Sequence, residues 1–186
     1  MALIVLGLIL WSAVHLIPSA APGIKAKWIG ALGKGGYRAT FSLLIIAAIV
    51  LMVMGWRYAL PTYLYTLSEQ IHLATIGIMA FAAVLFVAAK LPTRIKCVIR
   101  HPQLTAVALW ALAHLLANGD SRSVVLFGGM LVWSVLEMFL INRREGSRPP
   151  TPVTGFAIEI VVLALGGALF IGLMIAHPYL SGITLG

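Results

Sequence analysis

Six long apolar runs dominate this sequence, and they determine the solvent in which the chain folds. They cover residues 2–17, 41–58, 71–91, 102–117, 123–141 and 155–176. Their lengths are close to the about 20 residues that a helix needs to cross a hydrocarbon core of about 30 Å. In a bilayer the backbone must satisfy its own hydrogen bonds, and a helix does so within one segment. The sequence therefore predicts an all-α fold, a polytopic membrane bundle of six transmembrane helices that forms a single domain over residues 1–186.

Positive charge alternates between the loops and predicts the orientation of the chain. Of the 13 Lys and Arg residues, eleven lie in or beside the loops that follow the first, third and fifth runs. These are Lys25, Lys27, Lys34, Arg38, Lys90, Arg94, Lys96, Arg100, Arg143, Arg144 and Arg148. Short loops rich in Lys and Arg stay in the cytoplasm, so both termini are expected in the periplasm, across a bacterial inner membrane. The first run lacks a preceding basic segment and is expected to be a retained helix rather than a cleaved signal.

The formal net charge of +8 follows from this sorting and does not indicate nucleic-acid binding. The basic stretch around Trp28 is expected to attract anionic lipid headgroups. The neighbouring segment GALGKGG does not match a phosphate-binding loop, because glycine follows Lys34 where that motif needs Ser or Thr. A flexible loop or the end of an interfacial helix is expected there. Cys97 is the only cysteine, so one chain can form neither a disulfide nor a thiolate metal site.

Residues 102–117 form an apolar helix that keeps polar side chains along one face. At about 3.6 residues per turn, one stripe contains Gln103, Val107, Trp110, His114 and Asn118. An imidazole that faces lipid without a hydrogen-bond partner is costly, so this stripe is expected to face the interior of the bundle. His114 then either hydrogen-bonds across a helix interface or binds a ligand.

His15 and His72 are the candidate partners of His114. With a rise of about 1.5 Å per residue, His114 lies roughly 18 Å above the cytoplasmic boundary and His15 about 10 Å above it. His72 falls near the opposite boundary. Helix tilt and side-chain reach make His15 the better partner and leave His72 in reserve.

A second polar layer is expected within about three helical turns of the cytoplasmic boundary. Its members are Glu137, Glu159, His15 and His101. Acids in membrane spans are costly and tend to pair with bases. The layer predicts either ion pairs that lock the helices together or a site open to the cytoplasm, with Arg100 and His101 at its mouth.

The turn before residue 121 and two glycine pairs have simpler interpretations. Asp120 is expected to cap the next helix by accepting hydrogen bonds from its first N–H groups, with Gly119 supplying the tight turn. Close packing between helices is expected at two glycine pairs, Gly128 with Gly129 and Gly166 with Gly167.

Two histidines from facing helices, held between aromatic walls, can bind haem iron from both sides. His114 and His15 are the expected metal ligands, with Trp110 as a wall of the pocket. Arg100 or Arg38 would pair with the haem propionates at the cytoplasmic edge. A zinc site is disfavoured, because its usual thiolate ligands are missing.

Several motifs in order carry a resemblance to a known family. They are LWSAVHLIPS near the N-terminus, RHPQ followed by WALAHLLANGD, and LFGGMLVW. They resemble the NnrU family of bacterial membrane proteins over most of the chain. Membership implies a role in denitrification, in the reduction of nitrite and nitric oxide, but it implies no defined reaction.

The same motifs are more distantly similar to plant 15-cis-zeta-carotene isomerase, a membrane enzyme that uses haem b. A histidine after the RHPQ motif binds haem there, which implies that role for His114. The first-span histidine corresponds to His15, and the histidine of the motif itself is His101. The isomerase has a cysteine three residues before its ligand histidine, where this chain has Ala111. A redox-linked exchange of ligands is therefore not implied here.

A third resemblance is to the isoprenylcysteine carboxyl methyltransferase and phospholipid methyltransferase group. It implies S-adenosylmethionine binding by His101, Arg143, Arg144 and Glu145. The paired glutamates usual in that group are reduced here to Glu145 followed by glycine, which counts against this interpretation.

Residues and resemblances together predict a haem b membrane protein of the denitrification-associated type. If it is catalytic, its substrate would be nitric oxide or an apolar molecule that reaches the iron from the bilayer. One alternative is an accessory factor, without a cofactor, for the nitrite and nitric oxide reductases; the other is a membrane methyltransferase. Oligomerisation is permitted but not required.

Overall fold

The computed structural model describes residues 1–147 and 155–182, apart from the side chains of Glu69, His72 and Leu180. This part of the chain forms seven α-helices and no strand beyond one isolated bridge. The helices are α1 (Ala2–Ala20), α2 (Pro22–Tyr58), α3 (Glu69–Ala88), α4 (Ile95–Val98), α5 (Pro102–Ala117), α6 (Ser121–Glu145) and α7 (Phe156–Ser181). The all-α prediction is confirmed. The expected number of helices was wrong, because one turn of helix, α4, forms in the loop between α3 and α5.

Six of these helices are apolar, and they differ in length. Four of them, α1, α2, α6 and α7, are long and apolar enough to cross a membrane. The apolar helix Leu73–Ala88 within α3 and the 16-residue α5 are shorter. A helix as short as α5 spans about 24 Å at 1.5 Å per residue, less than a hydrocarbon core of about 30 Å. The two short helices pack against each other. The chain is thus built as a membrane protein, and the side on which its termini lie stays a prediction.

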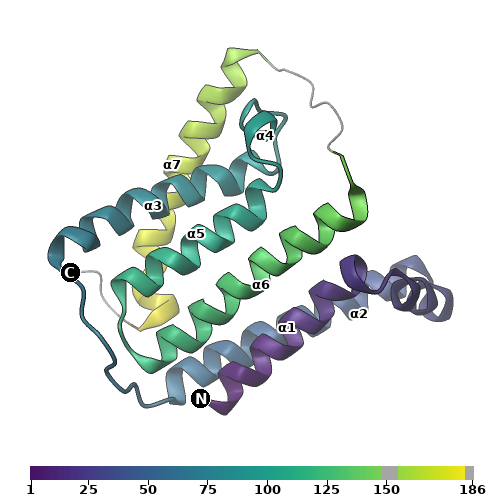
Figure 1. Cartoon of the computed structure of the whole chain (residues 1–186), viewed down its shortest axis with the longest axis horizontal. Helices are drawn as coiled ribbons and strands as arrows, with labels where there is room; N and C mark the ends of the chain where they lie inside the picture. The colour runs from purple at the N-terminus through teal and green to yellow at the C-terminus, as the bar shows by residue number, and fades with distance from the viewer. Residues whose placement is uncertain (148–154, 183–186) are drawn as a thin grey trace.

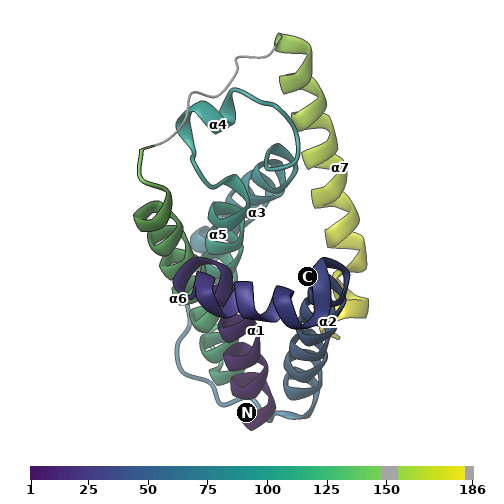
Figure 2. The same cartoon turned by 90° about the vertical axis from the view of Figure 1, so that its right-hand side faces the viewer.

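Helix α2 departs most from the sequence prediction. It begins directly after α1, and most of the expected first loop is helical. Its 37 residues are broken at Gly33, whose φ of 70° and ψ of 170° suit a residue without a Cβ. Figure 2 shows the segment before this break running across the view, whereas the rest of α2 runs down it. The flexible-loop alternative for GALGKGG is therefore wrong.

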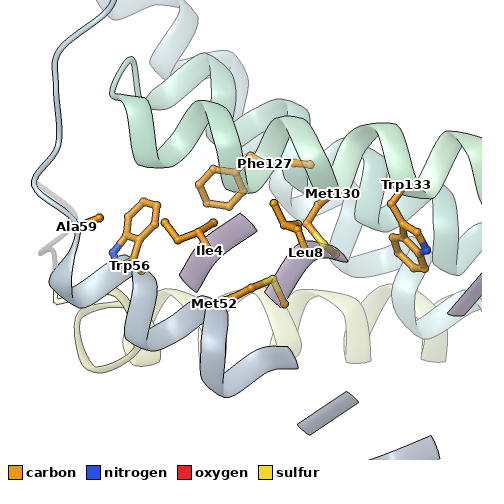
Figure 3. Packing of buried hydrophobic residues seen from close by; sticks show 9 residues of the cluster. Ile4, Leu8, Met52, Trp56, Ala59, Phe127, Met130 and Trp133 are labelled. Atoms are coloured by element: carbon orange, nitrogen blue, oxygen red, sulfur yellow. The ribbon is translucent and has the colours of Figure 1, made fainter. Parts of the chain in front are cut away.

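Neighbouring helices pack in the order α2, α1, α6, α5, α3 and α7, so that α6 lies between α1 and α5 (Figure 1). The main core is formed where α1, α2 and α6 meet (Figure 3). Its large side chains are Ile4, Leu8, Met52, Trp56, Phe127, Met130 and Trp133. Helices α1 and α2 approach closely at Gly55, where an added Cβ would lie 2.5 Å from the backbone nitrogen of Ile4.

One glycine of each predicted pair is a packing point and the other is not. A Cβ on Gly129 would lie 2.7 Å from Leu8 of α1, and one on Gly166 would lie 2.7 Å from the Cα of Val84 in α3. A Cβ on Gly128 or Gly167 would meet nothing within 4 Å. Successive helical residues point about 100° apart, so only one member of a pair can face the neighbouring helix. The prediction was right for Gly129 and Gly166 and wrong for the other two.

The bundle has two ends that differ in composition. The His114 end contains the N-terminus, the turn between α5 and α6, and the end of α7 (Figure 1). The basic end contains α4 and the start of α5.

Candidate functional site

His114 lies in the last turn of α5, with its imidazole held in one orientation. Its Nδ1 lies 2.8 Å from the backbone oxygen of Trp110. A carbonyl oxygen can only accept, so Nδ1 carries the proton and Nε2 carries the lone pair. No hydrogen bond to Nε2 occurs among the described residues. The ring stacks on Phe127 of α6 at 4.3 Å between centroids, so the polar stripe of α5 faces the bundle at His114. At its other end the prediction was wrong, because Gln103 is exposed and accepts a hydrogen bond from Lys90.

His177 of α7 is the residue that the structure brings to His114, and the sequence prediction missed it. Their ring centroids lie 6.4 Å apart and the ring planes differ by 26°. A signal for this pair was present in the sequence. Alternate spans run in opposite directions, so the fourth and sixth run the same way, and both histidines lie near the end of their helix. Their depths in the membrane therefore match, although depth does not reveal which helices are neighbours.

His15 lies in a separate aromatic cluster between α1, α2 and α6. Its ring centroid is 4.2 Å from that of Trp11, 5.1 Å from that of Trp133 and 5.5 Å from that of Phe41. Its Nδ1 lies 3.0 Å from the backbone oxygen of Trp11, the same anchoring as in His114. The indole N–H groups of Trp11 and Trp133 are buried and find no acceptor among the described residues.

The structure does not bring His15 and His114 together. His15 contacts α6 at Trp133, whereas His114 contacts it at Phe127. Six residues of helix separate these positions by about 9 Å along the axis of α6. Helix α6 also lies between α1 and α5 (Figure 1). The side chain of His72, the reserve ligand, is outside the described residues, and its backbone lies near the start of α3.

Arg100 and His101 lie at the basic end and fasten the start of α5 to the end of α6. His101 Nε2 lies 2.8 Å from the side-chain oxygen of Asn142, and Arg100 donates to the backbone oxygen of Gly146 at 2.8 Å. Glu145 lies 3.5 Å from Arg100 and 3.0 Å from Arg144. Along α5, Arg100 is about 20 Å from His114. Arg100 is therefore remote from any pocket that His114 forms.

The two acids of the predicted polar layer accept hydrogen bonds from hydroxyl groups. Ser19 donates to Glu137 at 2.7 Å and joins α1 to α6. Glu159 accepts from the Thr93 hydroxyl at 2.5 Å and from the backbone N–H of Arg94 at 2.8 Å, which joins α7 to the segment before α4. These bonds favour the interpretation that the layer locks the helices together, but the locking contacts found for Glu137 and Glu159 in the described part of the chain are hydrogen bonds instead of the expected ion pairs.

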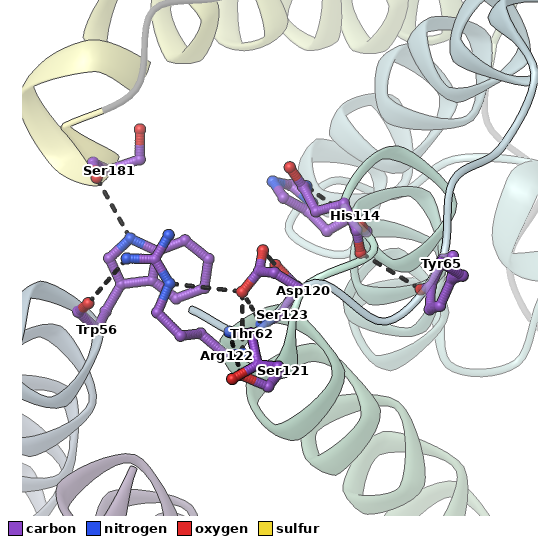
Figure 4. A network of polar contacts seen from close by, with 10 residues as sticks. Trp56, Thr62, Tyr65, His114, Asp120, Ser121, Arg122, Ser123 and Ser181 are labelled. Carbon is purple, nitrogen blue, oxygen red and sulfur yellow. Dashed lines mark hydrogen bonds and ion pairs between the residues drawn. The ribbon is translucent and has the colours of Figure 1, made fainter. Parts of the chain in front are cut away.

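A polar network closes the His114 end (Figure 4). Asp120 caps α6 as predicted, accepting from the backbone N–H groups of Arg122 and Ser123 at 2.9 and 3.2 Å. Burial acts to raise the pKa of Asp120, but the hydrogen bonds from Ser123 and Arg122 and the charge of Arg122 outweigh it and lower the pKa. The guanidinium of Arg122 also lies 4.5 Å from the ring of Trp56, whose indole N–H donates to the Ser181 carbonyl at 3.2 Å. The network thus links α2, α6 and α7.

Tyr65 fixes the turn that follows His114. Its hydroxyl lies 2.5 Å from the backbone oxygen of Leu115 and 3.3 Å from that of Asn118, so it caps the end of α5. The backbone N–H of Leu64 donates to the Gly119 carbonyl at 2.7 Å. A Cβ on Gly119 would lie 1.7 Å from the Tyr65 carbonyl oxygen, so only glycine fits this turn. In Figure 4 the His114 ring projects from α5 toward the side on which Trp56 and Ser181 lie.

Fold and site define the class: a polytopic α-helical membrane protein with an anchored histidine facing a second helix at one end of the bundle. The family model described as NnrU protein matches residues 3–185, so the chain belongs to the NnrU family. No curated protein and no solved structure matches it. The likenesses to the isomerase and to the methyltransferases stay predictions.

Proposed function

We propose that this protein is a haem b protein of the bacterial inner membrane that acts in the reduction of nitrite and nitric oxide, with His114 as an iron ligand. The apolar helices support the membrane location. The denitrification role rests on what the family resemblance implies. The haem rests on one observation, the anchored imidazole of His114 with no hydrogen bond to Nε2 among the described residues.

The donor set at His114 fits haem. Imidazole is a common axial ligand of haem iron, and a ligating histidine usually donates its other N–H to a backbone carbonyl or a carboxylate. His114 makes this second contact through Nδ1. The rings of Trp110 and Phe127 lie 5.1 and 4.3 Å from the His114 ring and form apolar walls. When bound, haem supplies electron transfer or the binding of a small molecule such as nitric oxide.

The chain itself orients the ligand and closes the His114 end. Trp110 fixes the tautomer of His114, and Tyr65 holds the last turn of α5 in which His114 lies. The paired turns of residues 62–65 and 119–121 cover this end through backbone hydrogen bonds. The sequence favours His15 for the second axial position, with His72 in reserve, but the structure places His15 in a separate aromatic cluster.

The test of haem binding is an absorption spectrum of protein purified from haem-replete membranes. We expect a Soret band and a pyridine haemochrome of haem b, both lost in His114→Ala. His101→Ala is the matched control and should keep the band, because His101 bonds to Asn142 at the basic end. A colourless wild type would contradict the proposal and favour the accessory factor. S-adenosylmethionine binding that is lost in Glu145→Ala would instead favour the methyltransferase.

The denitrification role needs a separate measurement. Cells that lack the protein should consume nitrite and nitric oxide more slowly under low oxygen, and wild-type protein should restore the rates. His114→Ala should restore them less well than His101→Ala if the haem is required. Unchanged consumption in cells without the protein would show that the proposed role is wrong even if haem is bound.

A further inference from the structure

His177 faces His114 from a different helix, and its Nδ1 contacts a serine hydroxyl where Nδ1 of His114 contacts a backbone carbonyl. The Ser181 hydroxyl donates to the His177 carbonyl at 2.9 Å, and its oxygen lies 3.2 Å from Nδ1 of His177. Because the hydroxyl proton is directed to the carbonyl, the Ser181 oxygen accepts from Nδ1–H. In the neutral ring of His177, as in that of His114, the lone pair is then on Nε2.

The spacing of the two rings suits a metal between them. Two imidazole nitrogens on opposite sides of one metal lie about 4 Å apart, and each lies roughly 1 Å from its ring centre, so the centres are about 6 Å apart. The ring centroids of His114 and His177 are 6.4 Å apart, close to this distance, and the two rings are stacked, with planes 26° from parallel. His15, in contrast, contacts α6 at a position well removed from the one that His114 contacts.

The small number of protein ligands favours haem, in which the porphyrin supplies the equatorial ligands of the iron. The described residues contain no group of three or more His, Cys, Asp or Glu side chains that could hold a metal ion. A protein zinc site usually needs three or four such ligands, whereas haem iron needs only one or two axial ligands. Among the described residues, two facing imidazoles are too few ligands for a bare zinc ion but are enough as axial ligands of haem iron.

We propose that His177 is the second axial ligand, so that the iron is bound between α5 and α7 at the His114 end of the bundle. This inference rests on the proposed function and replaces His15 in it. It also gives α7 a role, because this helix packs along α3 and brings His177 to the end of α5.

The test compares the spin state of the haem in the wild type, His177→Ala and His15→Ala. The wild type and His15→Ala should be low-spin, with two strong axial ligands. His177→Ala should become high-spin or lose the band, and added imidazole should restore the low-spin spectrum. A low-spin His177→Ala variant without imidazole would overturn the inference, and a colourless wild type would overturn the proposed function with it.

A second variant covers the case in which the alanine variant does not fold. His177→Met keeps an axial donor, and a His/Met pair raises the reduction potential of haem relative to two histidines. We expect a low-spin haem with a higher reduction potential in His177→Met and an unchanged potential in His15→Met. The opposite pattern, with the potential raised only by His15→Met, would assign the second ligand to His15 and leave the proposed function intact.

Discussion

The Ser19 hydroxyl in α1 donates a hydrogen bond of 2.7 Å to the carboxyl group of Glu137 in α6. Both side chains are buried, at 7% and 8% exposure. This bond fastens two helices at the point where each approaches the basic end.

Removal of this bond should weaken the contact between α1 and α6. Ser19→Ala leaves a buried acceptor without its donor, and we expect a loss of about 1–2 kcal/mol of unfolding free energy. Glu137→Gln keeps an oxygen acceptor and should lose less. Thermal unfolding in detergent, followed by circular dichroism, measures both, with Ser42→Ala at an exposed position of α2 as the control. Equal stability of Ser19→Ala and Ser42→Ala would show that the bond contributes nothing.

Two adjacent glycines of α7 provide a matched pair for the α3–α7 contact. A Cβ on Gly166 would overlap the backbone of Val84, whereas one on Gly167 meets nothing within 4 Å. Gly166→Ala should cost about 1–3 kcal/mol through overpacking, and Gly167→Ala should be neutral or gain up to about 1 kcal/mol from helix propensity. The same thermal unfolding measures the difference. Two variants of equal stability would argue against close packing of α3 and α7 at this point.

Asp120 should make stability depend on pH in the acid range. Its folded pKa is lowered from the ordinary value of an aspartate, because the effect of burial is outweighed by the bonds from Ser123 and Arg122 and by the charge of Arg122. A group with a lowered folded pKa contributes stability above its unfolded pKa and loses it as the pH falls through the folded pKa. Wild type should therefore lose stability below about pH 4, whereas Asp120→Asn, which retains a capping oxygen, should lose less over this range. We would measure the unfolding free energy of both proteins from pH 6 down to the lowest pH at which they fold. An equal loss of stability in the two proteins would contradict the stabilising role of ionised Asp120.

Asp120→Ala removes the cap altogether. At neutral pH we expect it to cost about 1–2 kcal/mol, the usual effect of losing an N-cap. Asp120→Asn should retain most of that stability, because Asn is a good N-cap residue. Chemical or thermal unfolding of the three proteins at pH 7 compares them directly.

Cys97 allows the predicted orientation to be tested without a new label site. It is the only cysteine, it is exposed, and it lies in α4 among basic residues. If this end faces the cytoplasm, a membrane-impermeant maleimide should label it in inverted vesicles but not in spheroplasts. Tyr63→Cys in a Cys97→Ser background places a thiol at the other end and should show the reverse. Labelling of Cys97 in intact spheroplasts would mean that both termini lie in the cytoplasm.

Much of the local structure was predictable because it depends on neighbours in the sequence. The cap at Asp120 follows from a carboxylate one residue before a helix, and the inward face of His114 follows from the cost of placing an imidazole in lipid. For the segment GALGKGG the sequence left two alternatives, a flexible loop or the end of an interfacial helix. The structure excludes the loop, because within α2 only Gly33 departs from helical backbone angles.

The partners of the histidines could not be predicted in the same way. The helical rise per residue gives the depth of each side chain in the membrane, but it does not determine which helices are neighbours. By depth alone His15 suits His114 as a partner, but the structure places α6 between their helices and puts His177 of α7 beside the end of α5.

The sequence by itself determined that the chain is a helical membrane protein, where most of its helices lie, and which face of α5 is polar. These properties follow from hydrophobicity and from hydrogen bonds that close within one segment. Only the tertiary structure decided the order in which the helices pack, the glycines that face a neighbour, and the pairing of His114 with His177. Helix neighbours in a membrane are selected by close steric fit between surfaces that are almost equally apolar, and such a fit exists only once the helices have been assembled.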